Sequence, residues 1–504
     1  MKKVLLSIAV AMFAAAGFAQ NAVWESSIAS FEATDLFDQN SPAAMDKDGN
    51  LYVTGSQTTS FKFAGNDVDV LALGAYIAKY DATGKELFAI TLHGSITITA
   101  ITTDADNNLY VAGKFAGEAY IADVEGIEGD YETITNSEPD SKTASFIAKY
   151  DSNGNLLNVK SFEAEMPSHY DTKSVIFNKV VVNDSKVYVS LAYNANVVLA
   201  EGVTLVAKSR VLDLGGFPLE LGWNNHAVIA FDKNLASAEI IAELSRQEAC
   251  AEATDVLSFN FAVENNDVYV AAVGMGDLLF TAASDTQNVS YAVGDGTSEQ
   301  GAFIVKVGSG LVKYSNVSNT NSYPRYTIAG MEVKDGVAYL AGTFSDTNPF
   351  DNEKVAVGTH DVFVTADGVK VYTSEYAEDK CTELVGGFFV TANKTYMINV
   401  IWNADSKSCV AVKNYEIDNK SGECKVNDGV YTTASAFNED YLAIINCTDK
   451  TYINVYNAEG FATGIDEVVV EGENNAIYDL TGRRIEQVTK PGIYIVNGVK
   501  KLVK

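Results

Sequence analysis

The residues of this chain whose types and spacing could do chemistry are carboxylates at recurrent turns. The run Asp46–Asn50 reads DKDGN, like the start of a calcium-binding loop, and Asp104–Asn108 follows a similar pattern. A calcium loop needs an acidic ligand at its twelfth position, where this chain has Gln57. Asp, Asn and Gly are also the residues that tight turns favour. We interpret these runs as turns, with calcium as the alternative, and predict no cofactor.

The histidines do not form a metal-binding or catalytic pattern. The chain has four, His93, His169, His226 and His360, none at the spacing of a metal site, and it lacks the H-E-x-x-H motif. His226 and His360 come directly before expected strands, so we expect both in loops. No G-x-S-x-G motif marks a nucleophile, although a Ser-His-Asp triad can assemble from distant residues. We therefore predict no catalytic and no metal-binding residue.

Two features could form a ligand-binding face. The stretch Ala116–Thr143 is acidic and includes Asp123, Glu125 and Asp130. It is explained by a solvated surface, or by a site for a cation or a basic partner. Trp223 could stack on a sugar ring, or it could be a core aromatic residue. These four residues, Trp223, Asp123, Glu125 and Asp130, are the candidate ligand face.

A recurrent β-hairpin positions these residues. In its clearest form, Ile98–Phe115, an apolar run leads through an Asp/Asn turn into the strand Leu109–Gly113. Branched and aromatic residues suit a pleated strand, and Asn, Asp and Gly accept the turn geometry. The pattern occurs seven times, in Ala43–Ser56, Ile98–Phe115, Asn178–Tyr193, Ser258–Gly274, Ala329–Phe344, Gly386–Trp402 and Ser435–Cys447.

A second hairpin follows each copy of the first. Its clearest forms, Ala75–Ile90 and Ser145–Phe162, share the sequence I-A-K-Y-D before an x-x-G turn. Two hairpins make four strands, and seven such units predict an all-β fold, a seven-bladed β-propeller. The stretch Ala22–Phe31 resembles a fourth strand, and the last unit lacks one after Phe461. We therefore expect the N-terminal strand to complete the last blade and close the ring.

Most of the extra length lies between the second and third strands of a unit. These segments are Gln57–Gly74, Ala116–Thr143, Asn194–His226, Met275–Gly301 and Ser345–His360. Connections of one kind share one face of a propeller, so we expect the segments to form one rim, which commonly carries the binding surface. Short alternating runs within them indicate extra hairpins. Elaboration of the fold without a ligand is the other interpretation.

The two ends differ from the body. Residues 1–19 have a basic start at Lys2 and Lys3, an apolar stretch and a small-residue end, as in a cleaved signal peptide. Residues 20–464 hold the repeats. Residues 465–504 are expected to form a small β-module, in which the Asn497-Gly498 step predicts a tight hairpin. From Asn474 onward six Lys or Arg residues stand against two acidic ones, so this tail is basic.

Five cysteines are present, and an exported chain permits disulfides. Cys409 and Cys424 flank a predicted hairpin and are the candidate pair, with buried free thiols as the alternative. The others are Cys250, Cys381 and Cys447, and the spacings match no zinc pattern.

Charge and hydropathy restrict the partners. The net charge of −30 argues against nucleic acid, which proteins bind through clustered Lys and Arg. No stretch after the signal peptide reaches the roughly 18 apolar residues of a membrane helix. We therefore expect a protein that is secreted or held at the outer-membrane surface, with no membrane span in the mature chain and a protein or glycan as ligand.

The body of the chain resembles bacterial β-propeller repeat (SBBP-like) proteins. Their units read D-x-x-G-N-x-Y-V-T-G followed later by D-A-F-[IV]-A-K-Y-D-x-x-G. Asp46–Gly55 with Tyr76–Gly84, and Asp104–Gly113 with Phe146–Gly154, carry the resemblance, which fades toward the last two units. It implies the propeller fold and export rather than an activity.

The tail resembles the short form of the C-terminal sorting domain of type IX (Por) secretion. Tyr478–Arg484 and Lys490–Gly498 carry this resemblance, and the Pro-Asn-Pro strand that opens the longer form is absent. The resemblance implies that the secretion machinery is a partner of the tail.

Two functions fit these observations. The first is an exported, non-enzymatic binding protein with its ligand on the insertion-bearing face. The second is a secreted polysaccharide hydrolase or lyase with its site in the propeller channel. Such an enzyme would need carboxylates from several first strands converging on the channel. The first strands here are mostly apolar or small, as in Ala43-Ala44 and Phe388-Phe389, which favours binding.

Overall fold

The computed structural model describes most of the chain between residues 22 and 458. The described ranges are 22–30, 42–57, 60–68, 74–137, 142–165, 173–213, 216, 218–222, 225–247, 254–282, 285–291, 293–294, 297–318, 326–345, 347–348, 350–356, 360–374, 381–403, 405–406, 408–447 and 450–458, with 477–478, 484–485, 492–496 and 499–503 in the tail. All the regular elements in these ranges are β-strands, so the predicted all-β class is confirmed. They contain no helix long and apolar enough to cross a membrane.

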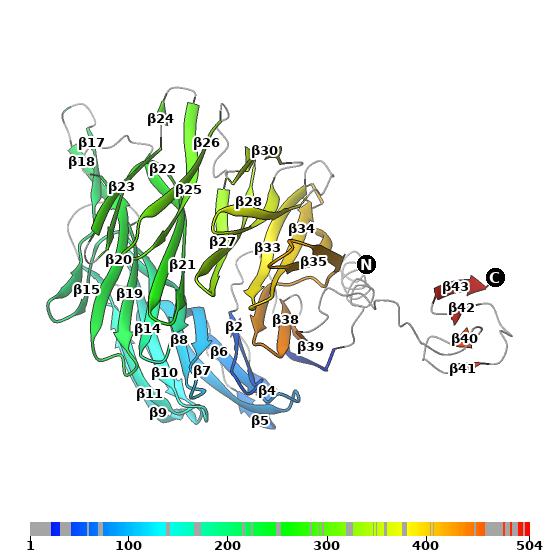
Figure 1. The fold of residues 1–504 in the computed structure, drawn as a ribbon. Helices are drawn as coiled ribbons and strands as arrows, with labels where there is room; N and C mark the ends of the chain where they lie inside the picture. The colour runs from blue at the N-terminus through cyan, green and yellow to red at the C-terminus, as the bar shows by residue number, and fades with distance from the viewer. Residues whose placement is uncertain are drawn as a thin grey trace.

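The strands form four-stranded antiparallel groups, which we call units and number in chain order (Figure 1). Unit 1 comprises β2 (Ala43–Met45), β3 (Leu51–Gln57), β6 (Gly74–Tyr80) and the first half of β7 (Glu86–Thr103). Unit 2 comprises the second half of β7, β8 (Leu109–Asp123), β10 (Lys142–Tyr150) and β11 (Leu156–Phe162). Unit 3 comprises β13 (Lys173–Val182), β14 (Lys186–Tyr193), β19 (Asn225–Asp232) and β20 (Ala238–Arg246).

The later units follow the same order. Unit 4 comprises β21 (Asp255–Glu264), β22 (Asp267–Ala282), β25 (Thr297–Lys306) and β26 (Leu311–Ser318). Unit 5 comprises β27 (Tyr326–Lys334), β28 (Val337–Phe344), β31 (Asp361–Ala366) and β32 (Val369–Thr373). Unit 6 comprises β33 (Cys381–Val390), β34 (Lys394–Asn403), β35 (Ser408–Asp418) and β36 (Cys424–Asp428). Each of the predicted first hairpins in these six units is present as an antiparallel pair.

The last group takes its outer strand from the other end of the chain. β37 (Ala434–Phe437), β38 (Tyr441–Cys447) and β39 (Lys450–Asn457) are joined by β1 (Trp24–Ser30), which we count with them as unit 7. Trp24 lies opposite Val455 in the antiparallel ladder, and Figure 1 shows the dark-blue β1 beside the orange strands. The predicted pairing of the N-terminal strand is confirmed.

The backbone hydrogen bonds do not form a closed ring. The strands of units 1 to 4 and three strands of their insertions form one network of 18 strands, whereas units 5, 6 and 7 are separate sheets. The 18-residue strand β7 helps to join units because it bends at Gly94, whose φ is +105°. A Cβ there would lie 2.6 Å from the carbonyl oxygen of Glu118, so the bend requires glycine.

Side-chain packing links each unit to the next, and it does so without a shared sheet from unit 4 onward and between units 7 and 1. Alternate residues of β6 show this: Ala75 and Ile77 belong to the apolar cluster shared with unit 2, whereas Tyr76 and Tyr80 belong to the cluster shared with unit 7. Because both faces of a sheet are covered, all seven residues of β6 are buried. First strands contact one another in the order β2, β7, β13, β21, β27, β33 and β37, and β37 contacts β2.

The inserted segments contain the extra hairpins that the sequence predicts. They are formed by β4 (Phe61–Phe63) with β5 (Asn66–Val68), β8 with β9 (Gly126–Thr135), β15 (Asn196–Ala200) with β16 (Val203–Leu205), β17 (Ser209–Asp213) with β18 (Pro218–Gly222), β22 with β23 (Asp285–Tyr291), and β29 (Thr347–Asn348) with β30 (Asp351–Val355). The short strands β12 (Ala164–Glu165) and β24 (Val293–Gly294) pair with β15 and β25.

These hairpins lie on the outer strand of the preceding unit. Ile121 of β8 pairs with Leu92 at the outer edge of unit 1, and Leu278 of β22 pairs with Arg246 at the outer edge of unit 3. β12, which follows the outer strand of unit 2, pairs with β15. In the same way, β4 contacts β1, the outer strand of unit 7, and β29 contacts β26, the outer strand of unit 4. An uncovered edge invites pairing with another chain, so the insertions have a structural role as edge covers.

The tail strands pair among themselves. β40 (Ile477–Tyr478) pairs with β41 (Arg484–Ile485) and with β42 (Gly492–Val496), and β42 pairs with β43 (Val499–Val503). The Asn497-Gly498 step of the predicted hairpin lies outside the described residues. Residues 1–19 lie outside the described residues.

The candidate pairing of Cys409 with Cys424 is not formed, and the loop position predicted for His226 is wrong. Cys409 and Cys424 are free thiols, because they lie on different strands far apart: Cys409 is opposite Trp402, whereas Cys424 is opposite Ile417, eight residues along β35 and so about 27 Å away. His226 lies inside β19 and stacks on the Phe259 ring at 5.2 Å, rather than in a loop. Burial there lowers the pKa of His226 to about 4.

Replacing Trp24 with alanine tests the role of the N-terminal strand. The Trp24 side chain is 9% exposed, lies 5.5 Å from the Tyr80 ring and fills the space beside Gly84. We expect Trp24→Ala to lower the free energy of unfolding by about 3 kcal/mol, measured by urea denaturation. Val23→Ala is the matched control, because Val23 is 46% exposed, and it should cost less than about 0.5 kcal/mol. Equal effects of the two changes would contradict the assigned role of β1.

Candidate functional site

The carboxylates at the first turn of units 1 and 2 are engaged by their own turns. Asp46 Oδ1 accepts hydrogen bonds from the backbone N–H of Asp48 at 3.0 Å and of Asn50 at 2.9 Å. Asp104 does the same with Asp106 and Asn108, both at 2.9 Å. Such bonds stabilise a tight turn. Within the ranges that the structure describes, no group of three His, Cys, Asp or Glu side chains could hold a metal ion.

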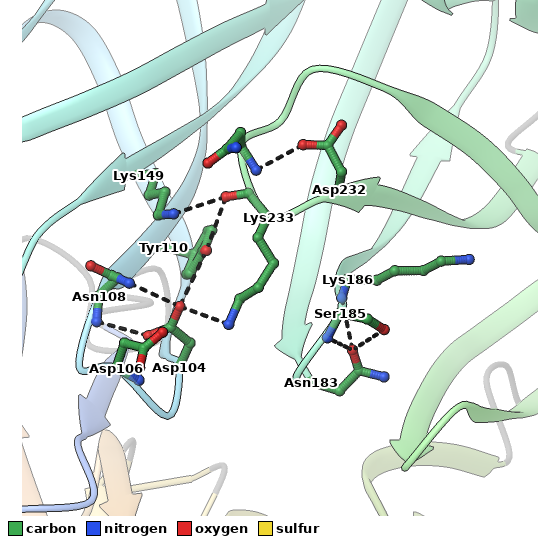
Figure 2. Close-up of polar contacts among 11 residues, drawn as sticks. Asp104, Asp106, Asn108, Tyr110, Lys149, Asn183, Ser185, Lys186, Asp232 and Lys233 are labelled. Atoms are coloured by element: carbon green, nitrogen blue, oxygen red, sulfur yellow. Dashed lines mark hydrogen bonds and ion pairs between the residues drawn. The ribbon is translucent and has the colours of Figure 1, made fainter.

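Asp104 also contacts the next unit (Figure 2). Its Oδ2 lies 3.0 Å from Lys233 Nζ of unit 3, and it accepts a 3.3 Å bond from the hydroxyl of Tyr110. Burial raises the pKa of Asp104, but bonds from Asn108 and Lys233 outweigh burial and leave the pKa below its usual value. The carboxylate is therefore a fixed anion in a contact between units.

Two directly opposite residues of unit 2 hold the turn of unit 3. Tyr110 on β8 and Lys149 on β10 face each other in the ladder, and the Lys149 ammonium lies 5.5 Å from the Tyr110 ring centre. Tyr110 donates to the Lys233 carbonyl at 3.1 Å, and Lys149 donates to the same oxygen at 3.0 Å. Asn158, which lies opposite Lys149 on β11, donates to the Asn234 carbonyl at 2.5 Å. We call this Tyr–Lys arrangement a turn seat.

Units 1 and 2 meet through a second turn seat. Lys79 lies 4.8 Å from the Tyr52 ring centre and donates to the carbonyl of Ser152 in the turn of unit 2, at 2.7 Å. Phe88 is opposite Lys79 on the fourth strand, and its ring abuts Gly154 of the same turn. Burial lowers the pKa of Lys79 and nearby carboxylates partly offset the shift. The repeated Lys and Tyr thus join successive units.

The same two residues occur in unit 4, but their surroundings differ. Lys306 lies 5.5 Å from the Tyr269 ring centre and bonds Asp267 Oδ2 at 2.6 Å, within its own unit. The corresponding turn of unit 5 has only two residues, Asp367 and Gly368, whereas units 2 and 3 have five, 151–155 and 233–237. Gly310 is the next residue of the β25–β26 ladder and so lies opposite Lys306. The corresponding residue is Phe88 in unit 1 and Asn158 in unit 2.

A cavity of about 290 Å³ lies where the longer turn would fit. It is lined by Tyr269, Ile304, Lys306, Gly310, Val312, Ala338 and Asp367. A Cβ added at Gly310 would meet no atom within 4 Å, which agrees with the open space there. The bond to Asp267 raises the pKa of Lys306, so its ammonium stays charged. An aromatic ring, an ammonium and a carboxylate on an apolar floor can bind a polar group. We call this cavity the open seat.

The first strands carry a second polar cluster. Lys179 of β13 donates to the carbonyls of Phe261 and Met331, both at 2.9 Å, and to Asn260 Oδ1 at 3.3 Å. It therefore braces the first strands of units 3, 4 and 5. Glu332 Oε1 lies 4.0 Å from Lys179 Nζ. Desolvation by the surrounding strands lowers the pKa of Lys179 and raises that of Glu332, whose side chain is still 47% exposed, while the attraction between the two charges opposes both shifts.

The predicted ligand face is only partly within the described residues. Asp123 is buried and its Oδ1 accepts a 2.7 Å bond from the N–H of Glu125, so it caps the turn between β8 and β9. Glu125 is exposed. The side chain of Asp130 and all of Trp223 lie outside the described residues. A shared ligand face of these residues stays a prediction.

Sequence reasoning missed the open seat. The signal was present in the repeated I-A-K-Y-D pattern, whose Lys recurs as Lys306 while the next unit has the short turn Asp367-Gly368. The sequence did not reveal that the recurrent lysines lie opposite the recurrent tyrosines of the second strands. The strand register decides these pairs, which are Tyr52 with Lys79, Tyr110 with Lys149, and Tyr269 with Lys306.

Comparisons with known proteins show no close relative. No protein-family model matches the chain, and no curated protein matches it. Among solved structures, the polysaccharide lyase Uly1 is similar with a TM-score of 0.42 and 10% identity, covering 84% of this chain and 91% of the lyase. Phage phi92 endosialidase has a TM-score of 0.32 and 9% identity, covering 93% and 75%. A Synechocystis apocarotenoid oxygenase variant has a TM-score of 0.31 and 7% identity, covering 76% and 74%.

The activities of these proteins are not transferred to this chain at such low similarity. The strand pairing and side-chain packing of this chain describe an all-β, propeller-like fold of repeated four-stranded sheets.

A matched pair of lysine variants tests the turn seats. Lys149→Met removes a buried ammonium from the Lys233 carbonyl and should lower the free energy of unfolding by about 2 kcal/mol. Lys306→Met removes an exposed ion pair and a contact with the Tyr269 ring, and should cost less than about 1 kcal/mol. Urea denaturation of both variants gives the comparison. An equal loss would show that the Lys149 contact does not join the units.

The turn cap Asp232 gives a pH-dependent prediction. Burial opposes ionisation, but bonds from Ser237, Ala236 and Asn234 outweigh it and lower the pKa of Asp232 to about 2. A lowered carboxyl pKa stabilises the fold above the unfolded value of about 3.9, and this stability is lost as pH falls toward 2. Asp232→Asn should therefore be destabilising at pH 7 and nearly neutral at pH 2, in unfolding measurements across that range. A constant difference would contradict the assigned pKa.

Proposed function

We propose that this chain is an exported, non-enzymatic binding protein whose ligand site is the open seat between units 4 and 5. The observation that carries the proposal is the cavity itself, which is lined by Tyr269 and Lys306, the counterparts of the Tyr–Lys pairs that grip a turn in units 1 and 2. Its ammonium, phenol ring and carboxylate can form hydrogen bonds and packing contacts with a ligand. The protein or glycan partner expected from the sequence would bind here.

We further propose that the units form a seven-bladed ring. The cyclic order of first-strand contacts, from β2 through β37 and back to β2, supports it. The apolar cluster that Trp24, Tyr80 and Val455 share across units 7 and 1 gives further support. In this arrangement side chains close the ring where the sheets of units 5, 6 and 7 remain separate, as they do between propeller blades.

Export remains part of the proposal. Its support is the sequence pattern of residues 1–19 and the basic tail that resembles a type IX sorting domain. In this proposal the tail strands β40–β43, which pair with one another, form the module that the secretion machinery recognises.

One observation favours a second candidate function, a polysaccharide hydrolase or lyase. Glu332 has a raised pKa beside Lys179 on the first strands, and a carboxyl group with a raised pKa suits general acid catalysis. Against this candidate, the Lys179 ammonium is held by two carbonyls and Asn260, so its hydrogen bonds are used within the protein.

Glycan and peptide arrays with residues 20–504, together with a polysaccharide turnover screen, distinguish the two functions. We expect binding without turnover, and Lys306→Met should weaken that binding while Glu332→Gln leaves it unchanged. Turnover of a polysaccharide that Glu332→Gln abolishes would overturn the binding proposal and establish the enzyme.

A further inference from the structure

We infer that the open seat binds a short peptide turn of a partner protein and that Lys306 donates a hydrogen bond to a main-chain carbonyl of that turn. This inference rests on the proposed binding function and names its ligand class. The inference follows from what the equivalent residues hold elsewhere in the same chain.

The filled turn seats define the chemistry of the ligand. Lys79 and Lys149 each donate to a backbone carbonyl, that of Ser152 and that of Lys233. In both turns this carbonyl belongs to the residue that follows an Asp. The Oδ1 atom of that Asp accepts hydrogen bonds from the backbone N–H groups of the residues two and four positions after it. Tyr269 and Lys306 lie directly opposite each other, as Tyr110 and Lys149 do. The open seat therefore matches an Asp-initiated turn that points a carbonyl outward.

The chain's own turn does not fill the open seat because it is short and fixed to unit 5. The N–H of Asp367 donates to the Ala338 carbonyl at 2.8 Å, and Asp367 Oδ1 accepts from the Ala338 N–H at 2.8 Å. Asp367 and Gly368 have φ values of +47° and +74°, which are typical of a two-residue hairpin turn. Gly310 leaves further space, and the resulting 290 Å³ is close to the lower end of ligand pockets, about 300 Å³.

Charge favours a neutral carbonyl over an anionic ligand. Lys306 is the ammonium of the open seat, and Asp267 already neutralises it at 2.6 Å. Asp367 adds a second carboxylate to the lining. A sulfate, phosphate or uronate group would meet a site with a net negative charge, whereas a peptide carbonyl needs only a donor.

The test uses the cyclised peptide Asp-Ser-Asn-Gly, the sequence of residues 151–154, as the probe. Binding to the full mature chain is measured by isothermal titration and by NMR of the labelled peptide. Lys306→Met should weaken binding about tenfold, the effect of one hydrogen bond. Gly310→Phe, which places in unit 4 the residue that unit 1 has at Phe88, should strengthen binding, because the Phe88 ring packs against the turn that unit 1 holds. Val426→Phe on the exposed face of β36, where Val426 is 48% exposed, is the matched control and should bind like the parent chain.

A loop graft gives an independent readout. Replacing Asp367-Gly368 with the five-residue sequence of 151–155 should fill the open seat, raise the Tm and abolish peptide binding. Peptide binding that survives the graft would overturn the inference, as would an absence of peptide binding to the parent chain. If the arrays still reveal a ligand sensitive to Lys306→Met, the proposed function stands while the peptide class is rejected. If the arrays reveal no ligand, the proposed function fails as well.

Discussion

The structure depends on a contact in which one unit grips a turn of the next. In the two filled turn seats, a Lys ammonium lies on a Tyr ring and donates to a backbone carbonyl of the neighbouring sheet. A buried carbonyl without a donor costs more than the bond itself contributes, so each seat binds its turn with specificity. Because hydrogen-bond ladders do not run continuously around the molecule, such contacts and the apolar clusters must set how the sheets meet.

The residues that recur most clearly in the repeats are therefore structural. Asp46 and Asp104 cap turns, and Lys79 and Lys149 hold turns of the next unit. The insertions also have a structural role, because strands of these insertions pair with the outer edges of neighbouring units, which would otherwise present unpaired backbone groups. Function is then expected where a repeat departs from this plan, and the short turn of unit 5 beside Gly310 is such a departure.

Much of the fold could be predicted from the sequence, because local patterns carry it. The hairpin around Leu109–Gly113 is encoded by its own alternation and turn residues, and the pairing of the N-terminal strand with the last unit followed from counting fourth strands. The candidate site could not be predicted in the same way. It depends on which residue lies opposite Lys306 and on the length of a turn some 60 residues away, at Asp367. Cys409 and Cys424 were misjudged for the same reason, since closeness in sequence does not give their register.

The most direct test of this account is a pair of double-mutant cycles. Tyr110→Phe with Lys149→Met probes a filled turn seat, and Tyr269→Phe with Lys306→Met probes the open seat. If the shared carbonyl of Lys233 joins the first pair, the coupling energy in urea unfolding should be about 1 kcal/mol larger there than at the open seat, where the contact is between the side chains of Lys306 and Tyr269. Equal coupling energies in the two cycles would contradict the central claim that a gripped turn distinguishes the two seats.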